Sequence, residues 1–112
     1  MKKIEAIVRP ERFEIIKDAL SDLGYDGMSV SEVKGHGNYK GVSEVWRGKR
    51  YRVDILPKIK IELVVPDKDC EKVIQTIVDE AKTGTVGDGR VFVFDVADAH
   101  RIRTGEKGDK IF

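Results

Sequence analysis

The sequence contains one cysteine, Cys70, so no disulfide can form within the chain. A chain without disulfides is typical of a reducing compartment. No apolar run approaches the ~18 residues that a membrane-spanning helix needs. Met1-Lys2-Lys3 leads at once into an alternating pattern, which is not the apolar segment of a signal peptide. We therefore expect a cytoplasmic protein.

Neither sign of charge dominates, because 21 basic residues stand against 20 acidic ones and the net charge is +1. This balance excludes a strong bulk attraction to nucleic acid or to an anionic membrane surface. The 112 residues are enough for one domain, residues 1–112, with a single hydrophobic core. A chain of this size buries roughly 65% of its unfolded surface and needs no cross-links.

Alternating apolar and polar residues predict strands, and apolar residues at helical spacing predict amphipathic helices. Pro10 suits a first helical turn, Gly24 a helix end and Asp67 an N-cap. Cys70 falls one turn before Ile74 and is expected to fill the core. The expected strands are residues 3–9, 28–33, 58–65 and 90–96, and the expected helices are residues 10–23 and 68–81.

The order strand-helix-strand occurs twice, with a long segment between the two copies. This doubling predicts an α+β, ferredoxin-like double β-α-β sandwich, in which four strands form an antiparallel sheet and two helices cover one face. The other face would carry charged and apolar side chains together, among them Lys3, Glu5 and Ile7. A half-exposed apolar sheet face is typical of proteins that form oligomers.

The long segment, residues 36–56, contains glycines and shows no sustained helical period. Loops of this length inside a compact domain are uncommon and are usually functional or disordered. Basic residues outnumber acidic ones here, and Tyr39, Trp46 and Tyr51 lie among them. Arginine with aromatic residues is the composition of interface hot spots. We favour a mobile, protruding recognition arm, and the alternative is a long hairpin whose aromatic residues pack back on the domain.

Residues 82–90 combine three glycines with a basic residue at either end. Glycines allow backbone conformations that a Cβ forbids, so the N–H groups can turn inward around an anion. Beyond the next strand, Arg101 and Arg103 alternate on one face of an expected strand and would clamp the same anion. We expect a phosphate site, and the alternative is an ordinary glycine-rich turn. The polar tail from Thr104 is expected to fray.

Five short motifs follow one another along the chain. They are Lys34-Gly35-x-Gly37, Arg47-Gly48-x-x-Tyr51-x-Val53-Asp54, Leu56-Pro57-Lys58, Thr83-Gly84-x-x-Gly87-Asp88-Gly89-Arg90-x-Phe92-Val93 and Arg101-Ile102-Arg103-Thr104-Gly105-Glu106. In their order and spacing they resemble the PII nitrogen-regulatory signal-transduction proteins. The resemblance covers essentially the whole chain.

The resemblance implies a homotrimer that binds ATP or ADP in clefts between subunits, with Mg²⁺ accompanying ATP. It implies that the arm, called the T-loop, docks on and inhibits targets in nitrogen metabolism, above all an ammonium transporter. Such a partner would bring the protein to the inner face of the membrane. In the family, ATP with Mg²⁺ and 2-oxoglutarate reshapes the arm. Given the net charge of +1, we expect no nucleic-acid partner.

The resemblance also assigns roles to single residues. Backbone N–H groups of residues 87–89 would meet the phosphates, while Ser29 and Glu62 would contact adenine and ribose. Arg101 and Arg103 would reach phosphates across the subunit boundary. The expected nucleotide contacts are Ser29, Gly35, Gly37, Lys58, Glu62, Val64, Gly87, Asp88, Gly89, Arg90, Arg101 and Arg103.

Two further roles concern the effector and the partner. Lys58 matches the lysine that holds a 2-oxoglutarate carboxylate in the family. Trp46, Arg47 and Tyr51 would contact the partner. In many relatives the tyrosine matching Tyr51 accepts a nucleotidyl group, and in others it only contacts the channel, so modification at Tyr51 stays open.

Four positions depart from the family pattern. Tyr39 stands where the 2-oxoglutarate responders have glutamine, whose amide oxygen helps hold Mg²⁺. A neutral phenol is a poor replacement for that oxygen, so we expect a weak or absent response to 2-oxoglutarate. Asn38 replaces the usual arginine, and His36 replaces an aromatic residue or arginine. Arg90 replaces the usual lysine, and either cation serves at a phosphate.

Two functions of other classes are alternatives. The first is a ferredoxin-like RNA-binding module, because residues 89–94 faintly echo an RNP motif, although on the fourth strand and not the third. The second is a small ATP-hydrolysing enzyme, although no nucleophile–base pair is visible and we expect no enzyme. His36, His100 and Cys70 lack the spacing of metal ligands, so no metal site is expected.

Overall fold

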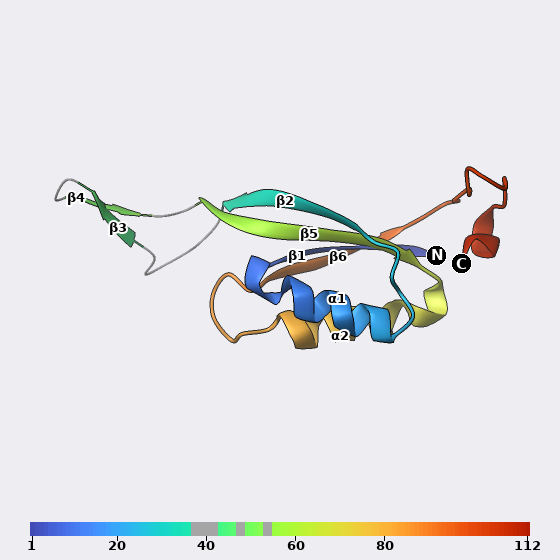
Figure 1. Cartoon of the computed structure of the whole chain (residues 1–112), viewed down its shortest axis with the longest axis horizontal. Helices are drawn as coiled ribbons and strands as arrows, with labels where there is room; N and C mark the ends of the chain where they lie inside the picture. The colour runs from blue at the N-terminus through green and yellow to red at the C-terminus, as the bar shows by residue number, and fades with distance from the viewer. Residues whose placement is uncertain (37–42, 47–48, 53–54) are drawn as a thin grey trace.

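A computed structural model describes residues 1–36, 43–46, 49–52 and 55–112, with only the backbone described for 43–46 and 49–52. The main sheet is antiparallel and has the order β2-β5-β1-β6. Its strands are β1 (Lys2–Val8), β2 (Ser29–His36), β5 (Ile55–Val65) and β6 (Gly89–Asp95). Figure 1 shows helices α1 (Phe13–Asp22) and α2 (Cys70–Ala81) side by side on one face of this sheet. The α+β, ferredoxin-like fold is confirmed.

Short 3₁₀ turns lead into both helices, namely η1 (Pro10–Arg12) and η2 (Asp67–Asp69). Gly24 follows α1 with a φ of +92°, as expected for a glycine that ends a helix. The expected N-cap at Asp67 is wrong, because Asp69 precedes α2 and no side chain caps it. The Asp67 carboxylate instead lies 2.9 Å from the terminal amine of Met1.

The strand register places alternate residues of β1 and β5 against the helices. Ala6 stands opposite Ile61 of β5 and Val91 of β6, and all three side chains pack in or against the core. Cys70 is buried, so its expected role as core filler is confirmed. The buried core consists of Ile4, Ala6, Val8, Ile16, Leu20, Ile61, Leu63, Val65, Cys70, Val73, Ile77 and Ala81.

The sheet face without helices mixes charges with aromatic rings. The Lys3 Nζ lies 2.6 Å from a Glu62 carboxylate oxygen and 5.7 Å from the centroid of the Phe94 ring. The Lys60 Nζ lies 3.6 Å from a Glu5 carboxylate oxygen. Phe92 and Phe94 are 44% and 46% exposed, which leaves an apolar strip along β6 at the edge of the sheet.

The arm between β2 and β5 contains regular structure. β3 (Ser43–Trp46) and β4 (Lys49–Arg52) pair as an antiparallel hairpin, with Val45 opposite Arg50. Figure 1 draws this hairpin beyond the paired ends of β2 and β5. The segment 36–56, expected as a recognition arm, therefore includes a short hairpin, and β5 begins within it at Ile55.

The C-terminal segment is also more ordered than expected. Residues 102–104 form a turn, so Arg101 and Arg103 do not alternate along a strand, and the tail ends in the 3₁₀ helix η3 (Gly108–Ile111). The Arg101 N–H donates to the Glu106 carbonyl at 2.7 Å. Gly105, with a φ of +73°, permits the tight turn that the strand prediction overlooked.

Candidate functional site

The loop between α2 and β6 changes direction at glycines with left-handed backbone conformations. Gly84, Gly87 and Gly89 have φ values of +88°, +100° and +106°. A Cβ added at Gly89 would lie 1.8 Å from the Ile7 carbonyl oxygen. The loop therefore passes so close to the end of β1 that only glycine fits at this position.

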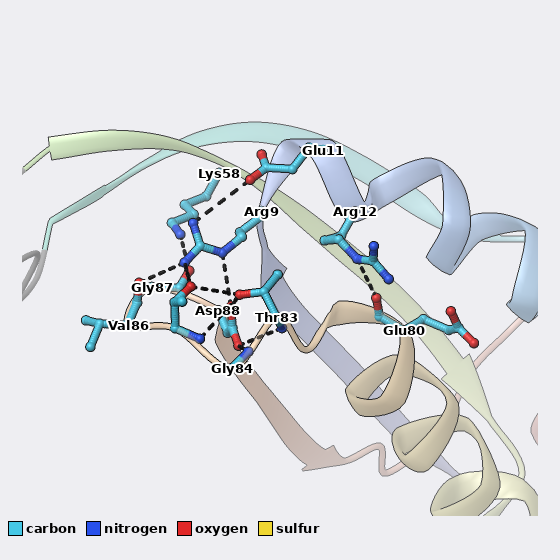
Figure 2. A network of polar contacts seen from close by, with 11 residues as sticks. Arg9, Glu11, Arg12, Lys58, Glu80, Thr83, Gly84, Val86, Gly87 and Asp88 are labelled. Carbon is cyan, nitrogen blue, oxygen red and sulfur yellow. Dashed lines mark hydrogen bonds and ion pairs between the residues drawn. The ribbon is translucent and has the colours of Figure 1, made fainter. Parts of the chain in front are cut away.

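The Asp88 carboxylate holds the first half of this loop in place (Figure 2). It accepts hydrogen bonds from the backbone N–H groups of Thr83 and Gly84, each at 2.9 Å, and from the Thr83 hydroxyl. These contacts, the Thr83 hydroxyl foremost, hold the pKa of Asp88 well below its usual range. The backbone N–H groups of residues 83–84 are therefore occupied by Asp88, so the expected phosphate contact depends on the second half of the loop, residues 87–89.

Arg9 is a contributor that the sequence analysis missed. Its Nε donates to Asp88 at 3.0 Å, and one terminal nitrogen donates to the Thr85 hydroxyl at 2.9 Å and to the Val86 carbonyl at 2.8 Å. Figure 2 shows this guanidinium in the middle of the loop contacts. Arg9 follows β1, which pairs with β6. A predicted pairing of the first and last strands would therefore have placed Arg9 beside the loop.

Lys58 forms the base of the site. Its side chain is 5% exposed, and its Nζ donates to the Gly87 carbonyl (Figure 2). Burial first, and then the neighbouring charge of Arg9, lower the pKa of Lys58. An anion placed beside Lys58 and Arg9 would relieve that repulsion.

A pocket of about 580 Å³, named here the phosphate-loop pocket, opens beside this loop. It brings together six of the residues expected to contact nucleotide. Its lining consists of Ile7, Gly35, His36, Lys58, Thr85, Val86, Gly87, Asp88, Gly89, Arg90 and Phe92.

A second, smaller pocket of about 330 Å³, named here the Ser29 pocket, contains the expected adenine and ribose contacts. Ser29 of β2 stands directly opposite Glu62 of β5. The lining consists of Lys3, Gly27, Met28, Ser29, Glu62, Leu63 and Val64. Nine of the twelve expected contact residues thus lie in one or the other of these two pockets, which share no lining residue.

The expected arginine clamps belong to neither pocket. Arg101 donates to the Glu106 carboxylate at 2.9 Å and to the Ile111 carbonyl at 2.6 Å, so it stabilises its own turn. Figure 1 shows the C-terminal segment at the opposite end of the molecule from the hairpin. Arg103 is exposed.

Several expected contacts fall outside what the structure describes. Gly37, Tyr39 and Arg47 lie outside the described residues, and of Trp46 and Tyr51 only the backbone is described. Across residues 1–36 and 55–112, no three His, Cys, Asp or Glu side chains gather as metal ligands. Among the described helices, none is long and apolar enough to cross a bilayer.

A larger pocket of about 970 Å³ lies elsewhere, between the end of α1 and the C-terminus. Its lining includes Tyr25, Asp69 and Phe112. The Tyr25 hydroxyl donates to Asp69, and burial, together with this bond, raises the pKa of Tyr25 to about 12. Sequence reasoning did not point to this pocket, and Val64 is the one expected contact that reaches it.

Acid is expected to destabilise the protein in part through Asp88. The folded state lowers the pKa of this carboxyl, so its contribution is present above the unfolded value of about 3.9 and is lost as the pH falls toward the folded value. Urea unfolding between pH 5 and 2 should therefore show a shallower loss of stability in Asp88→Asn than in the unmodified chain. Asp18→Asn, on the exposed side of α1, is the control and should keep the original slope. Equal slopes for Asp88→Asn and the unmodified chain would contradict this role.

Comparisons with known proteins agree on one family. The profile described as "Nitrogen regulatory protein P-II" matches residues 1–106. "Nitrogen regulatory protein P-II 1" of Escherichia coli (strain K12) is 52% identical over 109 residues, which cover 97% of each chain. "Nitrogen regulatory protein P-II 2" of Methanothermobacter thermautotrophicus is 52% identical over 110 residues, which cover 98% of this chain and 96% of the relative.

Proposed function

The chain belongs to the nitrogen regulatory protein P-II family, and from this membership we propose that it binds ATP or ADP between copies of itself. Proteins of this family are nitrogen-regulatory signal transducers and not classical enzymes. Nucleotide binding then controls how the arm, residues 36–56, binds and inhibits a target. An ammonium transporter is the target that we propose, and the protein would reach the membrane only through it.

The phosphate-loop pocket carries the proposal. ATP and ADP present adjacent phosphate groups, which need several donors and cations within a short space. The pocket offers a left-handed glycine turn at residues 87–89 together with Lys58 and Arg90. Backbone N–H groups in such a turn form a concave site for anions. These residues fit a polyphosphate, and bound Mg²⁺ would neutralise part of its charge.

The separation of the two pockets supports a site shared between copies. Lys58 and Val64 are six positions apart on β5, which corresponds to roughly 20 Å along a strand. In our proposal, the phosphate-loop pocket of one copy and the Ser29 pocket of its neighbour hold the two ends of one nucleotide. Arg101 and Arg103 of the neighbour then reach the phosphates. The exposed Phe92 and Phe94 supply apolar area for contact between copies in a homotrimer.

We expect Arg90→Ala to weaken ATP and ADP binding roughly tenfold to a hundredfold, because a hydrogen bond to a charged group contributes about 1.5–3 kcal/mol. Lys82→Ala is the matched control. Lys82 also flanks the loop, but it does not line the phosphate-loop pocket. Calorimetric titration of each variant with MgATP and ADP provides the measurement. Equal affinities for Arg90→Ala and the unmodified chain would contradict the assignment.

The partner is tested by retention of the cognate ammonium transporter on immobilised protein. We expect retention that depends on the nucleotide and is lost in Arg47→Ala, because a single long cationic side chain suits a cation-conducting vestibule. Adding 2-oxoglutarate to MgATP should leave retention nearly unchanged, because Tyr39 supplies no amide oxygen for Mg²⁺. Release only upon adding 2-oxoglutarate would contradict our interpretation of Tyr39. No retention under any condition would reject the channel as the target.

A further inference from the structure

His36 occupies an unusual place for a titratable side chain. It is the last residue of β2 and stands opposite Ile55 of β5, where the arm leaves the sheet. It is exposed, and it lines the phosphate-loop pocket together with Lys58 and Arg90. The side chain is therefore close to the anion site and at the base of the arm.

The charges around His36 make this position sensitive to an anion. The pocket lining contributes the cations Lys58 and Arg90 and the carboxylate Asp88. Behind them, Arg9 pairs with Asp88 at 3.0 Å and lies 3.9 Å from Glu11. The carboxylates of Asp88 and Glu11 offset part of the positive charge of the lysine and the arginines. The remaining cations would therefore not fully neutralise a bound polyphosphate, and a further cation could do so.

We propose that His36 is a further phosphate-binding residue and that its protonation makes nucleotide affinity depend on pH. This inference rests on the proposed nucleotide site and adds a residue and a regulatory property to it. The imidazolium would donate a charge-assisted hydrogen bond to a phosphate oxygen, whereas the neutral ring lacks that charge. Binding would draw a proton from solvent onto the ring, and no other bond forms or breaks.

The sign of the effect follows from linkage. A group that gains protons when ligand binds strengthens binding at low pH and stops contributing as the pH rises. An ordinary imidazole titrates near pH 6.5. For a ring whose proton affinity rises about tenfold on binding, affinity falls by a factor of about six between pH 6 and pH 8.

The test is calorimetric titration with MgADP at pH 6 and pH 8. The ratio of the two affinities should be about sixfold greater in the unmodified chain than in His36→Gln. Comparing the two chains in this way cancels the effect of protonation of the nucleotide itself, because that effect is the same for both chains. His36→Lys should keep tight binding at pH 8 and lose the dependence, because its charge persists. The same titrations at pH 7 in PIPES and ACES, two buffers of different ionisation enthalpy, should show about half a proton more taken up by the unmodified chain than by His36→Gln.

His100 is the competing source of a proton, because its Nε2 lies 3.0 Å from Asp98 in the C-terminal segment that also holds Arg101. Dependence on pH that survives in His36→Gln and disappears in His100→Gln would overturn the inference about His36. Equal dependence in all variants would overturn it as well. Both results would leave the nucleotide site standing, whereas absence of binding at both pH values would overturn the site and the inference together.

Discussion

A Gly89→Ala chain is expected to lose about 3 kcal/mol or more of folding stability and, with it, the phosphate-loop pocket. The left-handed backbone at Gly89 alone costs an alanine roughly 1–2 kcal/mol. The larger effect is steric, because the new Cβ would lie 1.8 Å from the Ile7 carbonyl oxygen. β1 and β6 pair at this point, so relieving the clash must separate the ends of these two paired strands.

Gly84→Ala is the matched control for Gly89→Ala. Gly84 has a similar φ of +88°, but a Cβ there would meet no atom within 4 Å. It should therefore lose only the backbone contribution, about 1–2 kcal/mol. Urea unfolding of the two variants separates the backbone contribution from the steric one. Equal losses of folding stability would show that the contact with Ile7 contributes nothing.

The second large effect is expected from Arg101→Ala combined with Arg103→Ala. If each guanidinium donates to phosphates of a nucleotide held by a neighbouring copy, each removal costs about 1.5–3 kcal/mol. Together they should weaken ATP and ADP binding on the order of a hundredfold or more. Light scattering before the titration should still give about three times 12.6 kDa, the mass of one chain.

The single variants distinguish contact with nucleotide from support of the turn. Arg101 holds its own segment through Glu106 and Ile111, so Arg101→Ala also loosens the turn. Arg103 is exposed, and Arg103→Ala chiefly removes a charge. Weakened nucleotide binding in Arg103→Ala therefore supports a direct contact. If the double variant binds as tightly as the unmodified chain, the clamp is wrong.

The sequence alone predicted the strands and helices of the sandwich because burial imposes a period on each element. Ile4, Ala6 and Val8 alternate along β1, and all three are buried. The glycine-rich loop was also recognisable, because left-handed backbone at Gly87 and Gly89 requires a residue without a Cβ. Local rules of this kind need no knowledge of the tertiary structure.

Two features of the chain could not be predicted from the period of an element. Arg9 reaches Asp88 only because β1 and β6 pair, and pairing is not encoded in the period of either strand. Arg101 and Arg103 alternate as a strand would, yet Gly105 allows the turn that bonds Arg101 to Glu106. In the first case the deciding contact joins segments 79 residues apart, and in the second a local glycine turn, with a contact between residues five apart, overrides the alternation.

Amide resonances measure directly whether residues 87–89 meet the phosphates of a nucleotide. Two-dimensional ¹⁵N–¹H spectra should show saturable shifts of the Gly87 and Gly89 amides as MgATP is added. The shifts should be much smaller in Arg90→Ala at the same nucleotide concentration. Shifts confined to residues 23–27, around the larger pocket near Tyr25, or no shifts at all, would show that residues 87–89 do not hold the phosphates.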